Sequence, residues 1–245
     1  MSALDDLCKT PFHEADNAAR AAVLRRLADT ELFVALAEEP EGETISLLRL
    51  PLGDGAEAAL ACDDEARLAA ALGRPVPYAV LPGRELARRL AAAGVGLLVN
   101  PDAPSAMLLD AGTLDWLTGA LAGAPAAEEA WLGPLRAPDA AVVAALAEPL
   151  GARLADMPGL VEEAVLVGAE GAHLLILKGT PEAARPALAK AVAELVAFLP
   201  PLPAPLDVTF DAPAALPAGA LAIRLEPLPP PQPAPPEPPR PPRLR

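Results

Sequence analysis

Few side chains in this sequence are of the types that perform covalent or metal chemistry. The cysteines are Cys8 and Cys62, and the histidines are His13 and His173. Zinc sites in proteins usually gather four such ligands, and Cys8 and His13 have no partners nearby in the chain, so we predict no metal site. His173 lies in a predicted hairpin strand, and we interpret it as an exposed residue rather than as a catalytic base.

Cys62 is the thiol that lies next to a predicted helix start, where the amide dipoles of a helix lower a thiol pKa. Asp63 and Asp64 follow it directly, and their negative charges favour the neutral thiol. We therefore interpret Cys62 as a small buried strand residue followed by a helix cap. No catalytic residue is predicted.

Arg84 and Asn100 are the candidate binding residues, because both follow predicted strands. Arg84 comes after a Pro82-Gly83 turn that opens a helix, where free N–H groups can hold a small anion or carboxylate. Asn100 follows a predicted parallel strand, at the edge where open α/β sheets bind ligands. The alternatives are a solvated helix start at Arg84 and an Asn100 side chain that satisfies its own turn.

No cofactor is predicted, because the glycine pattern does not fit a dinucleotide site. Gly94-Val95-Gly96 precedes a strand, whereas a dinucleotide fingerprint follows a strand and opens a helix. We interpret Gly94 as the residue that ends a helix.

The stretch from Pro77 to Pro101 contains both candidate residues and organises the first half of the chain. Apolar residues recur at helical spacing after Gly83, and Glu85 is placed to pair with Arg89. The flanking segments 78–81 and 95–99 have the continuous apolar character of strands covered on both faces. We predict a right-handed strand-helix-strand crossover at the centre of a sheet.

The remaining elements of the N-terminal domain, residues 1–122, are predicted from spacing and caps. Asn17 is predicted to cap a first helix, and Asp63 a helix that stops at Gly73. The other predicted elements are strands at 32–37, 45–50, 57–62 and 106–109 and a closing helix marked by Leu114, Leu117 and Leu121, with Trp116 beside them.

A second domain is predicted at 130–226, after a linker of small and turn-forming residues at 123–129. Its predicted order is strand 130–135, helix 138–154, hairpin strands 161–169 and 172–178, a helix capped by Thr180 with Pro181 at its first position, and strand 206–210. This β-α-β-β-α-β order is that of a ferredoxin-like domain. Pro186 must kink the second helix or delay its start, and 220–225 is an extra edge strand.

The predicted fold class is therefore α/β and α+β, with a mixed α/β sheet domain, a ferredoxin-like domain and a proline-rich tail at 227–245. The tail is predicted to be disordered polyproline II, because it cannot bury apolar surface. Pro235, Pro238 and Arg240 form a P-x-x-P-x-Arg pattern of the kind that polyproline-binding domains recognise.

Composition limits the possible partners. The formal charge of −14 repels nucleic-acid phosphates and anionic membranes, so we expect neither as a partner. The start is acidic, unlike a signal peptide, and no apolar run is long enough to span a bilayer. The two cysteines show no paired spacing, which favours a reducing compartment. We expect a soluble cytoplasmic protein, and the oligomeric state stays open.

The ordered part of the chain resembles the SseB family, named for enhanced serine sensitivity. The resemblance rests on ELFVAL at 31–36, PYAVLPGREL at 77–86 and GLLVNP at 96–101, and more diffusely on LDVTF at 206–210. The segment ALACDDEARLAAAL departs from the family, whose members often carry hydroxyl and aromatic groups there. The resemblance implies both domains in order, a cytoplasmic bacterial setting and no established catalytic residue.

Three function classes follow from these observations. A non-catalytic binding or adaptor protein is preferred, because the catalytic inventory is poor and two domains and a tail offer surfaces for a protein partner. The alternative is a domain that senses a small metabolite such as an amino acid, through Arg84 and Asn100. A thiol-dependent enzyme using Cys62 is the least favoured.

Overall fold

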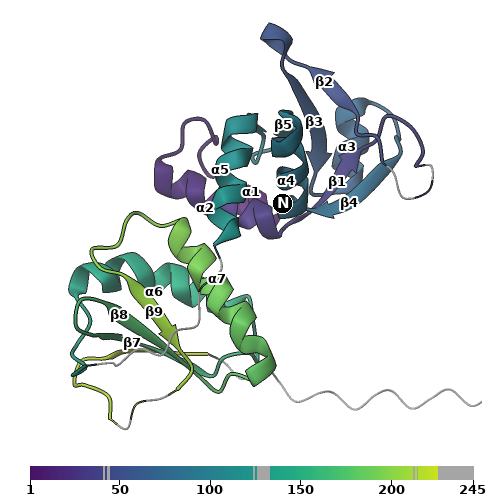
Figure 1. Cartoon of the computed structure of the whole chain (residues 1–245). Coiled ribbons are helices and arrows are strands. Elements are labelled where there is room, and N and C mark those ends of the chain that lie inside the picture. The colour runs from purple at the N-terminus through teal and green to yellow at the C-terminus, as the bar shows by residue number, and fades with distance from the viewer. Residues whose placement is uncertain are drawn as a thin grey trace, which may run out of the picture.

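The computed structural model describes residues 1–40, 42, 45–123, 125, 133–211, 213 and 215–225. They form two β-sheets, each with its own helices, and the two parts meet at α2, α5 and α7 (Figure 1). The fold is mixed α/β, as predicted. No helix in the described part of the chain has the length and apolar character needed to cross a membrane.

The N-terminal sheet contains six strands in the order β4-β1-β3-β5-β6, with β2 also paired to β3. Strands β3 and β5 are parallel, and the other pairs are antiparallel. The strands are β1 (Glu31–Ala35), β2 (Arg49–Pro51), β3 (Glu57–Cys62), β4 (Tyr78–Pro82), β5 (Gly96–Val99) and β6 (Met107–Leu109).

Helices cover both faces of this sheet. The larger core lies under α2 (Asn17–Asp29), α4 (Gly83–Ala93) and α5 (Ala111–Ala122), and α1 (Ala3–Leu7) adds Leu4 to it. A smaller core lies under α3 (Glu65–Leu72) on the opposite face, with Leu60, Cys62 and Leu68. A short 3-10 turn at Gly53–Gly55 precedes β3.

The crossover predicted between Pro77 and Pro101 is confirmed, but its place in the sheet is not central. Strand β4 lies at the edge with Tyr78 and Val80 exposed, because α4 carries the chain over β1 and β3 before β5 begins. The pair between Glu85 and Arg89 and the left-handed ending of α4 at Gly94 are both confirmed. Two predicted caps are each wrong by one residue: Asp16 caps α2 and Asp64 caps α3.

The C-terminal domain is a four-stranded sheet of order β10-β7-β8-β9 with both helices on one face. Its elements are α6 (Ala140–Ala155), β7 (Glu163–Gly168), β8 (His173–Lys178), a 3-10 turn (Glu182–Ala184), α7 (Arg185–Ala197), β9 (Leu206–Thr209) and β10 (Leu221–Arg224). Strand β10 takes the predicted edge position beside β7.

The ferredoxin-like topology is not confirmed. Strands β8 and β9 are connected by α7 and lie side by side in parallel, whereas a ferredoxin-like sheet keeps another strand between two strands joined in this way. Residues 130–132 of the predicted first strand are outside the described residues, as are most of the predicted linker and the tail at 227–245. Arg136 forms an isolated bridge to Gly168.

Two prolines lie in helices of this domain. Pro186 is in the first turn of α7, so the start of the helix is delayed as predicted, because a proline there gives up an N–H that has no intrahelical acceptor. The predicted cap at Thr180 is therefore wrong: Pro181 precedes a 3-10 turn, and Ala184 is the N-cap of α7. Pro149 lies inside α6.

Candidate functional site

A ring of four charged side chains joins the two domains. Asp29 on α2 and Arg84 on α4 face Arg153 on α6 and Glu194 on α7. Arg84 donates to both oxygens of Glu194, at 3.0 and 3.2 Å, and also to Asp29. Arg153 donates to the other oxygen of Asp29 at 2.6 Å and lies 3.8 Å from Glu194. We call these four side chains the junction ring.

The junction ring is shielded from solvent on its C-terminal side. Glu194 and Arg153 have side-chain exposures of 5% and 13%, and Arg84 and Asp29 have 35% and 27%. Burial raises the pKa of Asp29, but the hydrogen bonds and charges of Arg84 and Arg153 outweigh this effect and hold that pKa below its ordinary value. The ring therefore holds an ionised Asp29 between two arginines and acts as a clamp between the domains.

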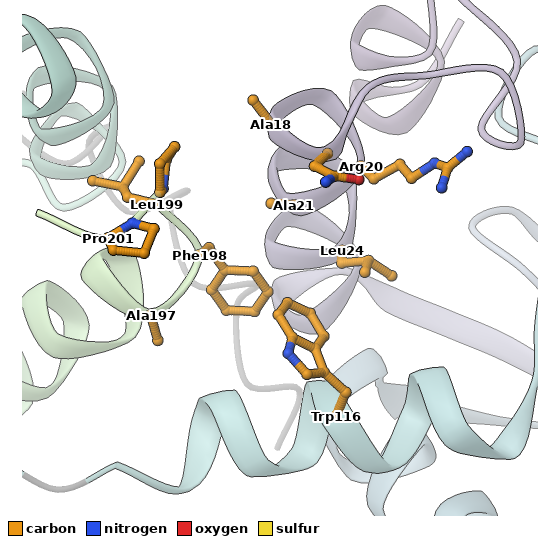
Figure 2. A pocket seen from close by; sticks show the side chains of 11 residues that line it. Ala18, Arg20, Ala21, Leu24, Trp116, Ala197, Phe198, Leu199 and Pro201 are labelled. Carbon is orange, nitrogen blue, oxygen red and sulfur yellow. The ribbon is translucent and has the colours of Figure 1, made fainter.

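A groove lies between the start of α2 and the residues that follow α7. It has a volume of about 510 Å³. Trp116 and Phe198 meet at its base, with ring centroids 5.5 Å apart and ring planes at 89° (Figure 2). Phe198 is buried in the core of the N-terminal domain, whereas Trp116 is 48% exposed. We call this space the interdomain groove.

The lining of the interdomain groove is mainly apolar. One wall is α2, with Ala18, Ala21 and Leu24, and the other is the segment from Ala197 to Pro201. The side chain of Arg20 points away from Phe198 (Figure 2) and donates to the carbonyl oxygens of Phe12 and His13. The groove therefore offers aromatic and aliphatic surface and few polar contacts.

Asn100 belongs to a second site, at the carboxyl ends of the parallel strands β3 and β5. It is fully buried with a φ of 45°, which an asparagine tolerates better than most residues. Its Oδ1 accepts the N–H of Asp63 at 3.0 Å, and its Nδ2 donates to Ser105 Oγ at 2.9 Å. The amide thus holds two loop segments together.

The same site holds a carboxylate from the start of the chain. Ser105 donates to Asp5 at 2.6 Å, and both terminal nitrogens of Arg67 donate to the Asp5 oxygens. The hydrogen bond from Arg67 is the largest influence on the pKa of Asp5 and holds it well below its ordinary value. We call Asp5, Asp63, Arg67, Asn100 and Ser105 the strand-end network.

The two candidate binding residues therefore lie in different places. Arg84 belongs to the junction ring and Asn100 to the strand-end network. The first amide of the predicted anion site, that of Gly83, donates to the carbonyl of Thr30 at 2.8 Å. Ligand binding by Arg84 or Asn100 remains a prediction.

The thiols and imidazoles are not arranged for catalysis. Cys62 is fully buried, and burial raises its pKa to about 11, so the thiol is protonated at neutral pH. Burial also raises the pKa of Cys8. His13 is exposed, and no group of three or more potential metal ligands occurs among the residues that the structure describes.

The prediction that His173 is exposed is wrong. Its side chain is fully buried, and Nε2 accepts the N–H of Asp139 at 3.1 Å, at the start of α6. The strand carrying His173 is covered on both faces, which the hairpin signal alone does not reveal.

Sequence reasoning also missed the interdomain groove and three of the four residues of the junction ring, Asp29, Arg153 and Glu194. One signal was present: Trp116 lies off the stripe of Leu114, Leu117 and Leu121 that faces the core, so a large aromatic side chain points outward. The pairing of Arg84 with Glu194 spans 110 residues and leaves no local signal.

Comparison with known proteins finds a match in the N-terminal part of the chain. A family model described as the SseB protein N-terminal domain matches residues 11–116. This range includes β1 to β6, α2 to α4 and the start of α5, and leaves out α1 with Asp5. No curated protein and no solved structure matched the chain.

Proposed function

The chain carries an SseB protein N-terminal domain at residues 11–116, and from this premise we propose that it is a non-catalytic binding protein. The interdomain groove is its proposed contact surface for an extended, proline-rich or apolar peptide. The link to serine sensitivity and a cytoplasmic bacterial setting, which the family resemblance implies, are part of the proposal.

The exposed indole of Trp116 is the observation that carries this proposal. A tryptophan that is 48% exposed, packed edge-on against a buried phenylalanine, is a rigid apolar platform with an N–H donor. Aromatic grooves of this kind hold the flat proline rings of polyproline II segments. The small side chains of Ala18 and Ala21 on α2 leave room for a backbone to lie in the interdomain groove.

Binding of labelled proline-rich peptides to the full-length protein tests the proposal by fluorescence anisotropy. Trp116→Ala is expected to weaken binding about 30-fold, as truncation of a central aromatic contact does. Tyr78→Ala is the matched control, because Tyr78 is an exposed aromatic residue on β4, outside the groove. Equal affinities for wild type and Trp116→Ala would rule the groove out as the peptide site.

Sensing of a metabolite that carries a carboxylate, such as an amino acid, is the second candidate function. The strand-end network supports it, because Arg67 and Ser105 of the matched domain hold a carboxylate that comes from Asp5, outside the matched range. Asp5 would then occupy the position of a ligand carboxylate, at the sheet edge where α/β proteins bind ligands.

Thermal shift of full-length Asp5→Ala tests this second candidate. Acetate, serine and related amino acids are added separately, with chloride as the ionic-strength control. A ligand at ten times its Kd stabilises by about 1.4 kcal/mol, which raises Tm by about 3–5 °C in a protein of this size. A second Arg67→Gln substitution is expected to abolish the shift. The absence of a shift with acetate and with every amino acid would refute this function.

A further inference from the structure

We propose that residues 227–245 of the same chain dock in the interdomain groove and compete there with other peptides. This inference rests on the proposed function of the groove as a peptide site and adds its regulation. The tail has the composition of the proline-rich peptides proposed for the groove, since eleven of its nineteen residues are proline.

The surface chemistry of tail and groove is complementary. A polyproline II segment presents flat ring faces and unpaired carbonyl oxygens, and it loses little conformational entropy on binding because proline already restricts it. The groove presents the Trp116 indole and the Phe198 ring between two walls of small and aliphatic side chains. An aromatic groove of this kind is the established type of binding site for such segments.

The tail starts close enough to reach the groove. It follows β10, where the N–H of Leu225 donates to the carbonyl of Glu162 in the same domain that supplies Phe198. A domain of about 100 residues has a radius of gyration of about 13 Å. About 20 residues of polyproline II extend about 60 Å, since the rise is about 3.1 Å per residue. The extended tail is therefore longer than its own domain is wide, which is the reach that docking in the groove requires.

Charge also favours this occupant. The tail contains Glu237 and three arginines, a net charge of +2, so residues 1–226 carry −16 of the chain total of −14. Asp16, whose carboxylate caps α2, and Asp115 are exposed and are the sequence neighbours of the groove residues Asn17 and Trp116. The P-x-x-P-x-Arg pattern that ends at Arg240 brings a cation to these carboxylates when its prolines contact the aromatic rings.

Docking within one chain has a predictable strength. A flexible connection of this length gives an effective concentration of about 1 mM. If the free tail binds with a Kd of about 100 µM, the groove is occupied about ten times more often than it is free. The affinity of a second peptide then falls about tenfold.

The experiment compares two full-length proteins. One is wild type, and the other has serine at every proline between 227 and 242. The probe is a labelled synthetic peptide with the sequence of residues 227–245. The serine variant is expected to bind it about tenfold more tightly than wild type does, and adding Trp116→Ala to both proteins is expected to remove this difference.

A second measurement tests whether the contact is intramolecular. In a Trp131→Phe background Trp116 is the remaining tryptophan. Its emission is expected to differ between wild-type and serine tails, and the difference is expected to persist over a hundredfold dilution and to shrink in high salt. A difference that disappears on dilution would mean that the tail binds a second copy, which overturns docking in the same chain.

The outcomes separate the two proposals. If the probe binds wild type and the serine variant with equal affinity, docking of the tail is overturned and the groove remains a peptide site. Docking of the tail is also overturned, and the groove again remains a peptide site, if the serine variant binds another proline-rich peptide but does not bind the probe. If no proline-rich peptide binds either protein, both the regulation and the proposed function are refuted.

Discussion

Removing Glu194 from the junction ring is a direct test of what couples the two domains. Breaking a buried ion pair by truncating one partner costs about 3–5 kcal/mol, because the other charge is left without compensation. Glu194 is almost completely buried, but Arg84 is 35% exposed and retains Asp29 as a partner. We therefore expect Glu194→Ala to lower the free energy of unfolding by about 2 kcal/mol.

A double-mutant cycle isolates the pair. Arg84→Ala is expected to cost about as much as Glu194→Ala, and the double variant about 1.5 kcal/mol less than the sum, because the contact is lost only once. Urea unfolding followed by circular dichroism and tryptophan fluorescence gives the free energies. In wild type the two signals are expected to change together, and in the variants to separate as the domains uncouple.

Glu85 and Arg88 provide the matched control on the same helix. They also form a doubly hydrogen-bonded carboxylate–guanidinium pair, at 2.8 and 3.0 Å, but their side chains are 31% and 60% exposed. Their coupling is expected to be much weaker than that of Arg84 and Glu194, because solvent screens an exposed pair. A coupling between Arg84 and Glu194 no larger than that of Glu85 and Arg88, with coincident transitions in every variant, would refute the role of the junction ring as a clamp.

Three further predictions concern single residues. Gly83→Ala is expected to lower the free energy of unfolding in urea by about 3 kcal/mol, because the new Cβ would lie 2.0 Å from the carbonyl oxygen of Leu27. Gly119→Ala is the control: its Cβ meets no atom within 4 Å, and it is expected to raise the free energy of unfolding by about 0.5–1 kcal/mol. Equal effects of the two substitutions would contradict this packing. The pKa of Asp5 in the folded protein is below its ordinary value of 3.8, so the stabilisation from its carboxylate is complete above that pH and is lost as the pH falls from there through the folded pKa. Below pH 4 the free energy of unfolding of wild type is therefore expected to fall more steeply with pH than that of Asp5→Asn. Parallel plots of unfolding free energy against pH would disprove this. Native Cys62, with a pKa of about 11, is expected to react with iodoacetamide at pH 8 at least about 100-fold more slowly than a cysteine peptide, and a peptide-like rate would show an accessible thiolate.

Local elements were predictable because their signals are local. The left-handed glycines at the ends of α3 and α4, the pair between Glu85 and Arg89, and the delay of α7 at Pro186 all depend on residues within one or two turns of each other. Cap positions were less certain, since adjacent residues such as Asp63 and Asp64 both have suitable side chains and only the backbone geometry chooses Asp64.

Strand order and burial were not available from the same signals. An apolar run such as Tyr78 to Leu81 predicts a strand, but its edge position depends on α4 crossing two other strands. In the C-terminal domain the order of elements is compatible with more than one sheet, and the parallel pairing of β8 with β9 decided against the ferredoxin-like arrangement. His173 was predicted to be exposed from the hairpin signal alone, although the continuous apolar run from Leu174 to Leu177 is typical of a strand covered on both faces.

The sequence by itself determined the element types, the match of residues 11–116 to the SseB N-terminal domain and the scarcity of catalytic side chains. It also identified Arg84 and Asn100 as polar residues at strand ends. Only the tertiary structure decided their partners, Glu194 and Asp29 for Arg84 and Ser105 for Asn100. The physical reason is range: propensity and capping act within a few residues, whereas the junction ring and the interdomain groove arise where helices far apart in the chain pack together.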